Sequence, residues 1–174
     1  MSAQELLADA ARRPVEAAEA AVENVSAEVL NRMPENTHNS MSWLLWHAAR
    51  QQDVQIAQLC DAEQVWTAEG WSGSFGLDRA AEDFGFGDRP EDVARVRLSD
   101  PGLLVGYLRA VCCATAQYLR SLSDEELDEV VDDSWDPPVT RGARIVSTID
   151  DAAQHVGQAA YVRGLVDEDW TGRY

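Results

Sequence analysis

Residues 140–166 read TRGARIVSTIDDAAQHVGQAAYVRGLV, and this stretch decides the fold class. Six of its residues recur every three or four positions: Ile145, Thr148, Ala152, His155, Ala159 and Val162. Because an α-helix turns once every 3.6 residues, that spacing places them on one face of a helix. The stretch therefore predicts a long helix over about 141–166 with one buried face.

Three further stretches show the same periodicity and predict helices over about 3–24, 40–61 and 101–121. Ser2 with Glu5 forms a capping-box signal, and Asp100-Pro101 combines an N-cap with proline at the first helical position. Pro14 is expected to kink the first helix or end its first segment. Sustained period-2 alternation is absent from the sequence, so we expect no sheet. The pattern predicts an all-α four-helix bundle.

A segment rich in glycine and aromatic residues separates the second and third predicted helices. Five glycines and five aromatic residues fall between positions 66 and 87. Such a long connection is uncommon in a compact domain, and the aromatic side chains favour burial. The segment belongs to an excursion over residues 66–99. We expect residues 66–86 to be ordered and to cover one mouth of a pocket or contribute to a dimer contact. Residues 1–174 are then one domain.

Composition narrows the possible partners and the cellular location. The chain has 174 residues, 45% of them hydrophobic, and a formal net charge of −17. Nucleic acids and anionic membranes require a cationic surface, so neither is expected as a partner. The sequence has no apolar run of membrane-span length, and its first residues, MSAQELLADAARR, are acidic and amphipathic. With only three cysteines, an odd number, we expect no disulfide framework and a cytoplasmic protein.

Three residues form a candidate metal site. His47 lies beside the apolar stripe of the second helix, and Asp151 and His155 lie four residues apart on the fourth. A carboxylate on a buried stripe is costly unless it is paired or bound to a metal. Two imidazoles and a carboxylate can hold a divalent ion and leave positions open for water or substrate. The alternatives are two histidines that only pack in the core and an Asp151 that pairs with an arginine.

Other polar residues on these two helices are candidates for binding a substrate. Arg50 follows His47 by one turn, and Gln158 and Arg163 follow His155. They are placed to line the candidate metal site, although charged side chains usually occupy a solvated face. The sequence has no G-x-S-x-G, Walker or H-E-x-x-H motif, so it identifies no catalytic nucleophile or base.

Two segments carry a resemblance to a known family: NSMSWLLWH over residues 39–47 and DAAQHVGQAAYVRG over residues 151–164. Together with EQVW at 63–66 and WDPPVT at 135–140, they resemble the DinB/YfiT-like superfamily. The most similar part is the actinobacterial branch related to mycothiol-dependent enzymes such as maleylpyruvate isomerase. The resemblance spans nearly the whole chain.

The resemblance implies a four-helix bundle with a long cross-connection, often dimeric. It also implies a divalent metal, here on His47, Asp151 and His155, with zinc expected and nickel or manganese as alternatives. Many members have His or Glu where this chain has Asp151, which puts the strength of the site in question. The resemblance further implies a small electrophile or a thiol such as mycothiol as partner. On that reading, Arg50, Gln158 or Arg163 would orient an anionic substrate or the polar groups of the thiol. The expected function is a thiol-dependent S-transferase or isomerase; the alternatives are a metal-dependent hydrolase and a non-catalytic small-molecule-binding or stress-response bundle.

Overall fold

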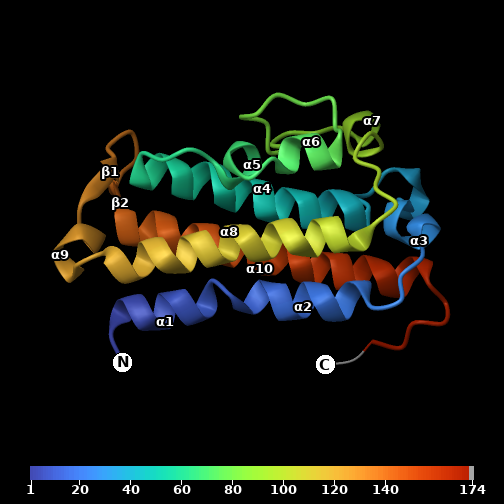
Figure 1. The fold of residues 1–174 in the computed structure, drawn as a ribbon, viewed down its shortest axis with the longest axis horizontal. Helices are drawn as coiled ribbons and strands as arrows, with labels where there is room; N and C mark the ends of the chain where they lie inside the picture. Colours follow the sequence, from blue (N-terminus) through green and yellow to red (C-terminus); the bar gives the residue numbers. More distant parts are fainter. Residues whose placement is uncertain (173–174) are drawn as a thin grey trace.

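The computed structural model describes residues 1–172 and shows an all-α bundle (Figure 1). Its four long members are the pair α1 (Ala3–Ala10) and α2 (Arg13–Val22), then α4 (Met41–Cys60), α8 (Pro101–Ser121) and α10 (Arg141–Val166). Short elements connect them: α3 (Ala27–Asn31), η1 (Pro34–Asn36), α5 (Val65–Ala68), α6 (Trp71–Phe75), α7 (Pro90–Val93) and α9 (Asp124–Leu127). The predicted all-α bundle is confirmed.

Helix boundaries follow the capping signals of the sequence. The Ser2 hydroxyl accepts from the Glu5 amide in a capping box, and the Asp100 carboxylate caps α8 ahead of Pro101. Pro14 lies in the first turn of α2, where its missing N–H costs nothing. It therefore divides the predicted first helix into two segments that continue one another along the bundle (Figure 1).

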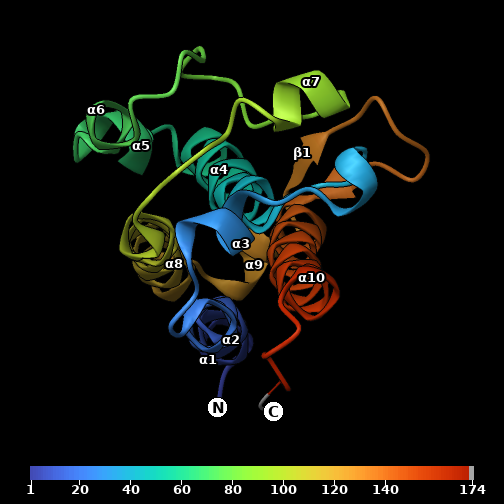
Figure 2. The same ribbon diagram turned by 90° about the vertical axis from the view of Figure 1, so that its right-hand side faces the viewer.

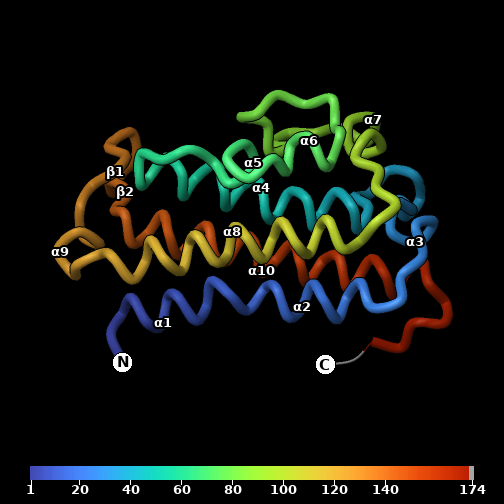
Figure 3. Tube along the Cα trace, viewed as in Figure 1, coloured from blue at the N-terminus to red at the C-terminus, as the bar shows by residue number. Residues whose placement is uncertain are grey.

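Chain direction explains the long excursion. In Figure 1, α4 and α8 run in the same direction, so the chain that leaves the end of α4 must return the whole length of the bundle before α8 begins. Elements α5, α6 and α7 make this return along the outer side of α4 (Figures 1 and 3). The predicted excursion is thus the connection that a parallel pair of helices requires.

Side chains from the bundle hold both ends of the excursion. The two carboxylate oxygens of Asp53 accept from the amides of Val65 and Trp66, each at 2.8 Å. At the far end, the Asn31 side chain accepts from the Leu98 amide at 2.9 Å and donates to the Leu98 carbonyl at 2.7 Å. The excursion is therefore a closed unit that begins and ends on the bundle.

The aromatic residues of the excursion differ in burial. Trp66 and Phe75 are buried and pack against Tyr107 of α8, with ring centroids 5.0 and 5.7 Å apart. Phe86, in contrast, is 87% exposed. The expectation that the aromatic residues favour burial is therefore wrong for Phe86.

Helix α4 lies at the centre of the molecule between α8, α10 and the excursion (Figure 2). Nearly every residue from Met41 to Ala57 is buried, including polar ones. Helix α8 is long and apolar enough to suit a membrane span by composition, but its buried face packs in the bundle core, as in a core helix.

The expectation that there is no sheet is wrong. Two short strands, β1 (Val130–Asp132) and β2 (Val139–Thr140), pair antiparallel just before α10. They have three and two residues, which is too short for an alternating pattern to be recognised in the sequence. The segment 135–139 lies in the connection between the two strands and in β2.

Candidate functional site

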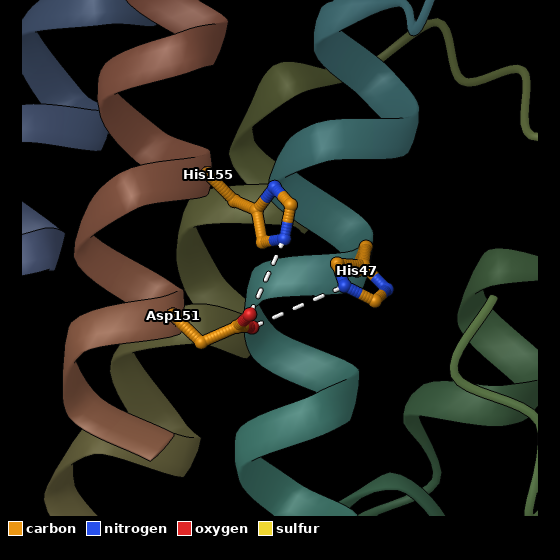
Figure 4. Close-up of side chains that lie close together, drawn as sticks. All are labelled: His47, Asp151 and His155. Carbon is orange, nitrogen blue, oxygen red and sulfur yellow. Dashed lines mark ion pairs between the residues drawn. The ribbon is translucent and has the colours of Figure 1, made fainter. Parts of the chain in front are cut away.

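The structure brings His47, Asp151 and His155 together between α4 and α10 (Figure 4). One nitrogen or oxygen atom from each lies within 4.8 Å of the others. Nε2 of His155 is 3.5 Å from one carboxylate oxygen of Asp151, and Nε2 of His47 is 4.0 Å from the other. The two helices run antiparallel and pack along their length, which places His47 opposite the pair spaced by four on α10 (Figure 1).

Both imidazoles are held by their other nitrogen. Nδ1 of His47 contacts the backbone carbonyl of Phe84, and Nδ1 of His155 lies 3.0 Å from the side-chain oxygen of Gln158. A carbonyl oxygen only accepts, so each Nδ1 carries the proton and donates. Each neutral ring then presents the lone pair of Nε2 toward Asp151, as a metal-binding histidine does.

Aromatic packing fixes the ring planes. Trp43, one turn before His47 on α4, stacks on its ring with centroids 4.6 Å apart and planes 6° from parallel. The His155 ring meets the His47 ring edge-on, at 4.5 Å and 88°. Neither ring can rotate freely, so the direction of both Nε2 atoms is set before any ligand arrives.

The two histidines have opposite pKa shifts. Burial lowers the pKa of His47 below its usual value, with a smaller lowering from neighbouring His155, and this outweighs the Phe84 carbonyl and nearby carboxylates. Burial also lowers the pKa of His155, but the hydrogen bond and charge of Asp151, with Gln158, outweigh it and leave the pKa raised. The difference reflects the closer approach of Asp151 to His155 than to His47.

The polar atoms of this group fit a cation. The Asp151 oxygen that faces His47 is buried and has no hydrogen-bond partner among the described residues. Within residues 1–172, the ion pairs of Asp151 are with the two histidines and none is with an arginine. A buried carboxylate oxygen and two imidazole lone pairs that face one another are stabilised by a divalent ion.

An open cavity of about 440 Å³ adjoins the group along the same seam between helices. Leu44 lies one turn before His47 on α4, and Gln158 lies one turn after His155 on α10. Both line the cavity, and because the helices are antiparallel the cavity lies next to the group. The remaining lining residues are Pro34, Glu35, His38, Asn39, Tyr161, Val162 and Leu165.

The structure places the three predicted substrate-binding residues differently. Gln158 lies between His155 and the cavity. Arg50 is fully buried, and its contacts are internal: Asp53, Tyr107, Gln64 and the carbonyls of Ala81 and Asp83. The Arg50 guanidinium therefore binds the excursion to α4.

Arg163 is also buried. It donates to the carbonyls of Ala21 and Glu23 and pairs with Asp167. Its described contacts therefore tie α10 to the end of α2, away from the His47 group.

Sequence reasoning missed two contributors to the site. The contact from Phe84 is made by its backbone carbonyl, which every residue has, so the residue type does not predict it. The contact from Trp43 is predictable, because Trp43 precedes His47 by four residues and therefore lies on the same face of the helix. That spacing is the signal that could have identified the stacked pair.

Comparison with known proteins gives a family and a fold. The family model described as Mycothiol-S-transferase matches residues 6–168. A solved structure, described as the crystal structure of a conserved protein from Enterococcus faecalis, is 37% identical with a TM-score of 0.90. The alignment covers 97% of this chain and 99% of that one. The search of curated proteins finds no match.

Proposed function

This chain belongs to the mycothiol S-transferase family of DinB-like proteins, and we propose that it joins a low-molecular-weight thiol to a small electrophile at His47, Asp151 and His155. The observation that carries the proposal is the orientation of the three side chains. Two Nε2 lone pairs and an unpartnered carboxylate oxygen face one another in the seam between α4 and α10.

We propose that these three residues hold a divalent metal, zinc first, with nickel or manganese as alternatives. Such an ion lowers the pKa of a thiol that binds to it. Three protein ligands leave positions open, which is the arrangement of a catalytic rather than a structural site. The neighbouring residues contribute rigidity, because Trp43 and the Phe84 carbonyl fix His47 while Gln158 fixes His155.

The overall reaction forms a bond between the thiol sulfur and an electrophilic carbon. The leaving group departs with its bonding electron pair, and the thiol proton passes to solvent. We place the electrophile in the 440 Å³ cavity, whose volume is within the range of small-molecule sites. The apolar part of the electrophile would contact Leu44, Val162 and Leu165. The side-chain oxygen of Gln158 accepts from His155, so its NH₂ group remains able to donate to the electrophile.

The test uses the two adjacent aspartates of α10. Protein purified without a metal-affinity step is loaded with zinc and mixed with mycothiol and a halobimane, and formation of the fluorescent thioether is followed. We expect turnover by the wild type and by Asp150→Ala, and loss of turnover for Asp151→Ala and after chelation. Asp150 is exposed and binds only Gln154 among the described residues, so it is the matched control.

Two results would contradict the proposal. Equal turnover by Asp151→Ala and Asp150→Ala would show that the group is not the site. Consumption of the electrophile without any thiol would identify a hydrolase instead. A homodimer, the absence of nucleic-acid and membrane partners, and a cytoplasmic location remain predictions; the three free cysteines are compatible with the last.

A further inference from the structure

One stripe of α4 holds the excursion at three successive points. Trp43, His47 and Arg50 are spaced by four and three residues, so they share one face of the helix. Trp43 donates to Asp88 at 2.7 Å, His47 donates to the Phe84 carbonyl, and Arg50 donates to the carbonyls of Asp83 and Ala81. The contacted residues fall in reverse order, because the excursion runs back along α4.

The backbone at Gly85 allows this close approach. Gly85 has a φ of +84°, which L side chains rarely adopt. A Cβ atom there would lie 2.9 Å from the Trp46 ring and 3.1 Å from the Trp43 ring. The Gly85 amide donates to the Asp83 side chain at 2.8 Å, and the Asp88 amide donates to the Gly85 carbonyl at 3.2 Å. Only glycine fits here, and the turn presents the preceding Phe84 carbonyl to His47.

A nearly buried ion pair fixes the turn from outside. Arg79 and Asp88 have side chains 10% and 12% exposed, and their closest atoms are 2.6 Å apart. Arg79 also reaches Asp83 at 2.9 Å, and its guanidinium lies 4.7 Å from the centroid of the Trp46 ring. Residues 79–88, which we name the clamp, are thus tied to themselves and to α4.

We propose that the clamp positions His47: the Phe84 carbonyl keeps the proton on Nδ1 and leaves Nε2 free to bind a metal. Gly85 and Asp88 are positioning residues, because they act through the Phe84 carbonyl and the Trp43 ring rather than by touching a metal or substrate. The inference rests on the metal site of the proposed function, but its first readout needs no metal.

That first readout is the tautomer of His47 in metal-free protein. At pH 8 a neutral imidazole has one protonated and one unprotonated nitrogen, and ¹⁵N NMR distinguishes them. We expect the Nδ1–H form in the wild type and a mixture of both forms in Gly85→Ala. An Nε2–H form in the wild type would overturn the inference, whatever the metal does.

The second readout is zinc affinity, measured by competition with a chromophoric chelator. Gly85→Ala is compared with Gly87→Ala, because Gly87 also has a positive φ, +79°, but a Cβ there would meet nothing within 4 Å. Both variants carry the backbone strain, and only Gly85→Ala displaces the turn. We expect Gly85→Ala to bind zinc about 10–100-fold more weakly than Gly87→Ala, the usual cost of losing a partner of a metal-binding histidine.

A second pair of variants covers the case in which Gly85→Ala does not fold. Asp88→Ala releases Trp43 and Arg79, whereas Asp78→Ala removes an exposed aspartate of the excursion that makes no hydrogen bond or ion pair within residues 1–172. We expect weaker zinc binding for Asp88→Ala alone. If the wild type binds zinc and both variants of each pair bind it equally, the clamp has no positioning role. If the wild type binds none, the proposed function fails and the tautomer alone decides the clamp.

Discussion

Oδ1 of Asp151 lies 3.5 Å from Nε2 of His155, whereas the nearest approach of Asp151 to Nε2 of His47 is 4.0 Å. The carboxylate thus lies closer to the histidine on its own helix than to the one on α4. The aspartate side chain is long enough to face both histidines across the seam between α4 and α10.

The length of this side chain leads to the first prediction. Asp151→Glu should keep zinc bound, because one more methylene moves the carboxylate toward His47. Asp151→Ala should weaken binding by more than about 100-fold, beyond the usual cost of losing only a partner of a ligand. Isothermal titration with zinc measures both. Loss of binding in Asp151→Glu would show that the seam has no room for the longer side chain.

Removal of either histidine gives the second prediction. We expect His47→Ala and His155→Ala each to abolish stoichiometric zinc, measured by elemental analysis, while the circular dichroism spectrum stays helical. Alanine is the best helix former, and both positions lie inside long helices. Full zinc content in either variant would remove that residue from the site.

The opposite pKa shifts give the third prediction, on pH. Zinc requires neutral imidazoles, so protons compete with it. His155 has a raised pKa and takes up a proton first, already above the usual value of about 6.5, while His47 has a lowered pKa and stays neutral to below it. As the pH is lowered, zinc affinity should therefore begin to fall while the pH is still above 6.5, and it should fall more steeply below pH 6.5. NMR titration of the metal-free protein checks the order, and protonation of His47 first would contradict it.

The buried arginine on α4 leads to the fourth prediction. Nη1 of Arg50 lies 3.2 Å from Oδ2 of Asp53 in a buried ion pair, and the Tyr107 hydroxyl hydrogen-bonds to both residues. Arg50→Met should lower the free energy of unfolding by about 3–5 kcal/mol, because it leaves a buried carboxylate without its counter-ion. Urea denaturation measures this. The control is Arg109→Met, which breaks the half-exposed pair with Glu19 and should cost at most about 1 kcal/mol. Equal losses would show that the buried pair is not special.

Helical periodicity and capping residues predicted the four long helices closely, because each has a strong apolar stripe and a clear start. Ser40 and Thr140 cap α4 and α10 as N-cap residues do, so the boundaries near them could be read directly. The strands β1 and β2 could not be predicted, since pairs this short depend on the surrounding tertiary structure.

The sequence likewise predicts some positions near the candidate site and not others. His47, Asp151 and His155 were predictable because helical spacing fixes the face on which each residue lies. The place of Arg50 was not, because its partners on the excursion come from positions 64, 81 and 83, and periodicity says nothing about how a loop folds back. A charged residue in a helix pattern is usually exposed, and this one is 0% exposed.

The ties at both ends of the excursion have a consequence for local unfolding. Asp53 holds its start and Asn31 holds its end, so the chain between them can detach while the hydrogen bonds of α4 and α8 stay intact. We expect such a segment to open as one cooperative unit, whose amides exchange with solvent hydrogen together and sooner than those of the bundle helices. Because Phe84 belongs to this unit, each opening event would also release Nδ1 of His47, so the lifetime of a metal bound at the proposed site should depend on how often the excursion opens.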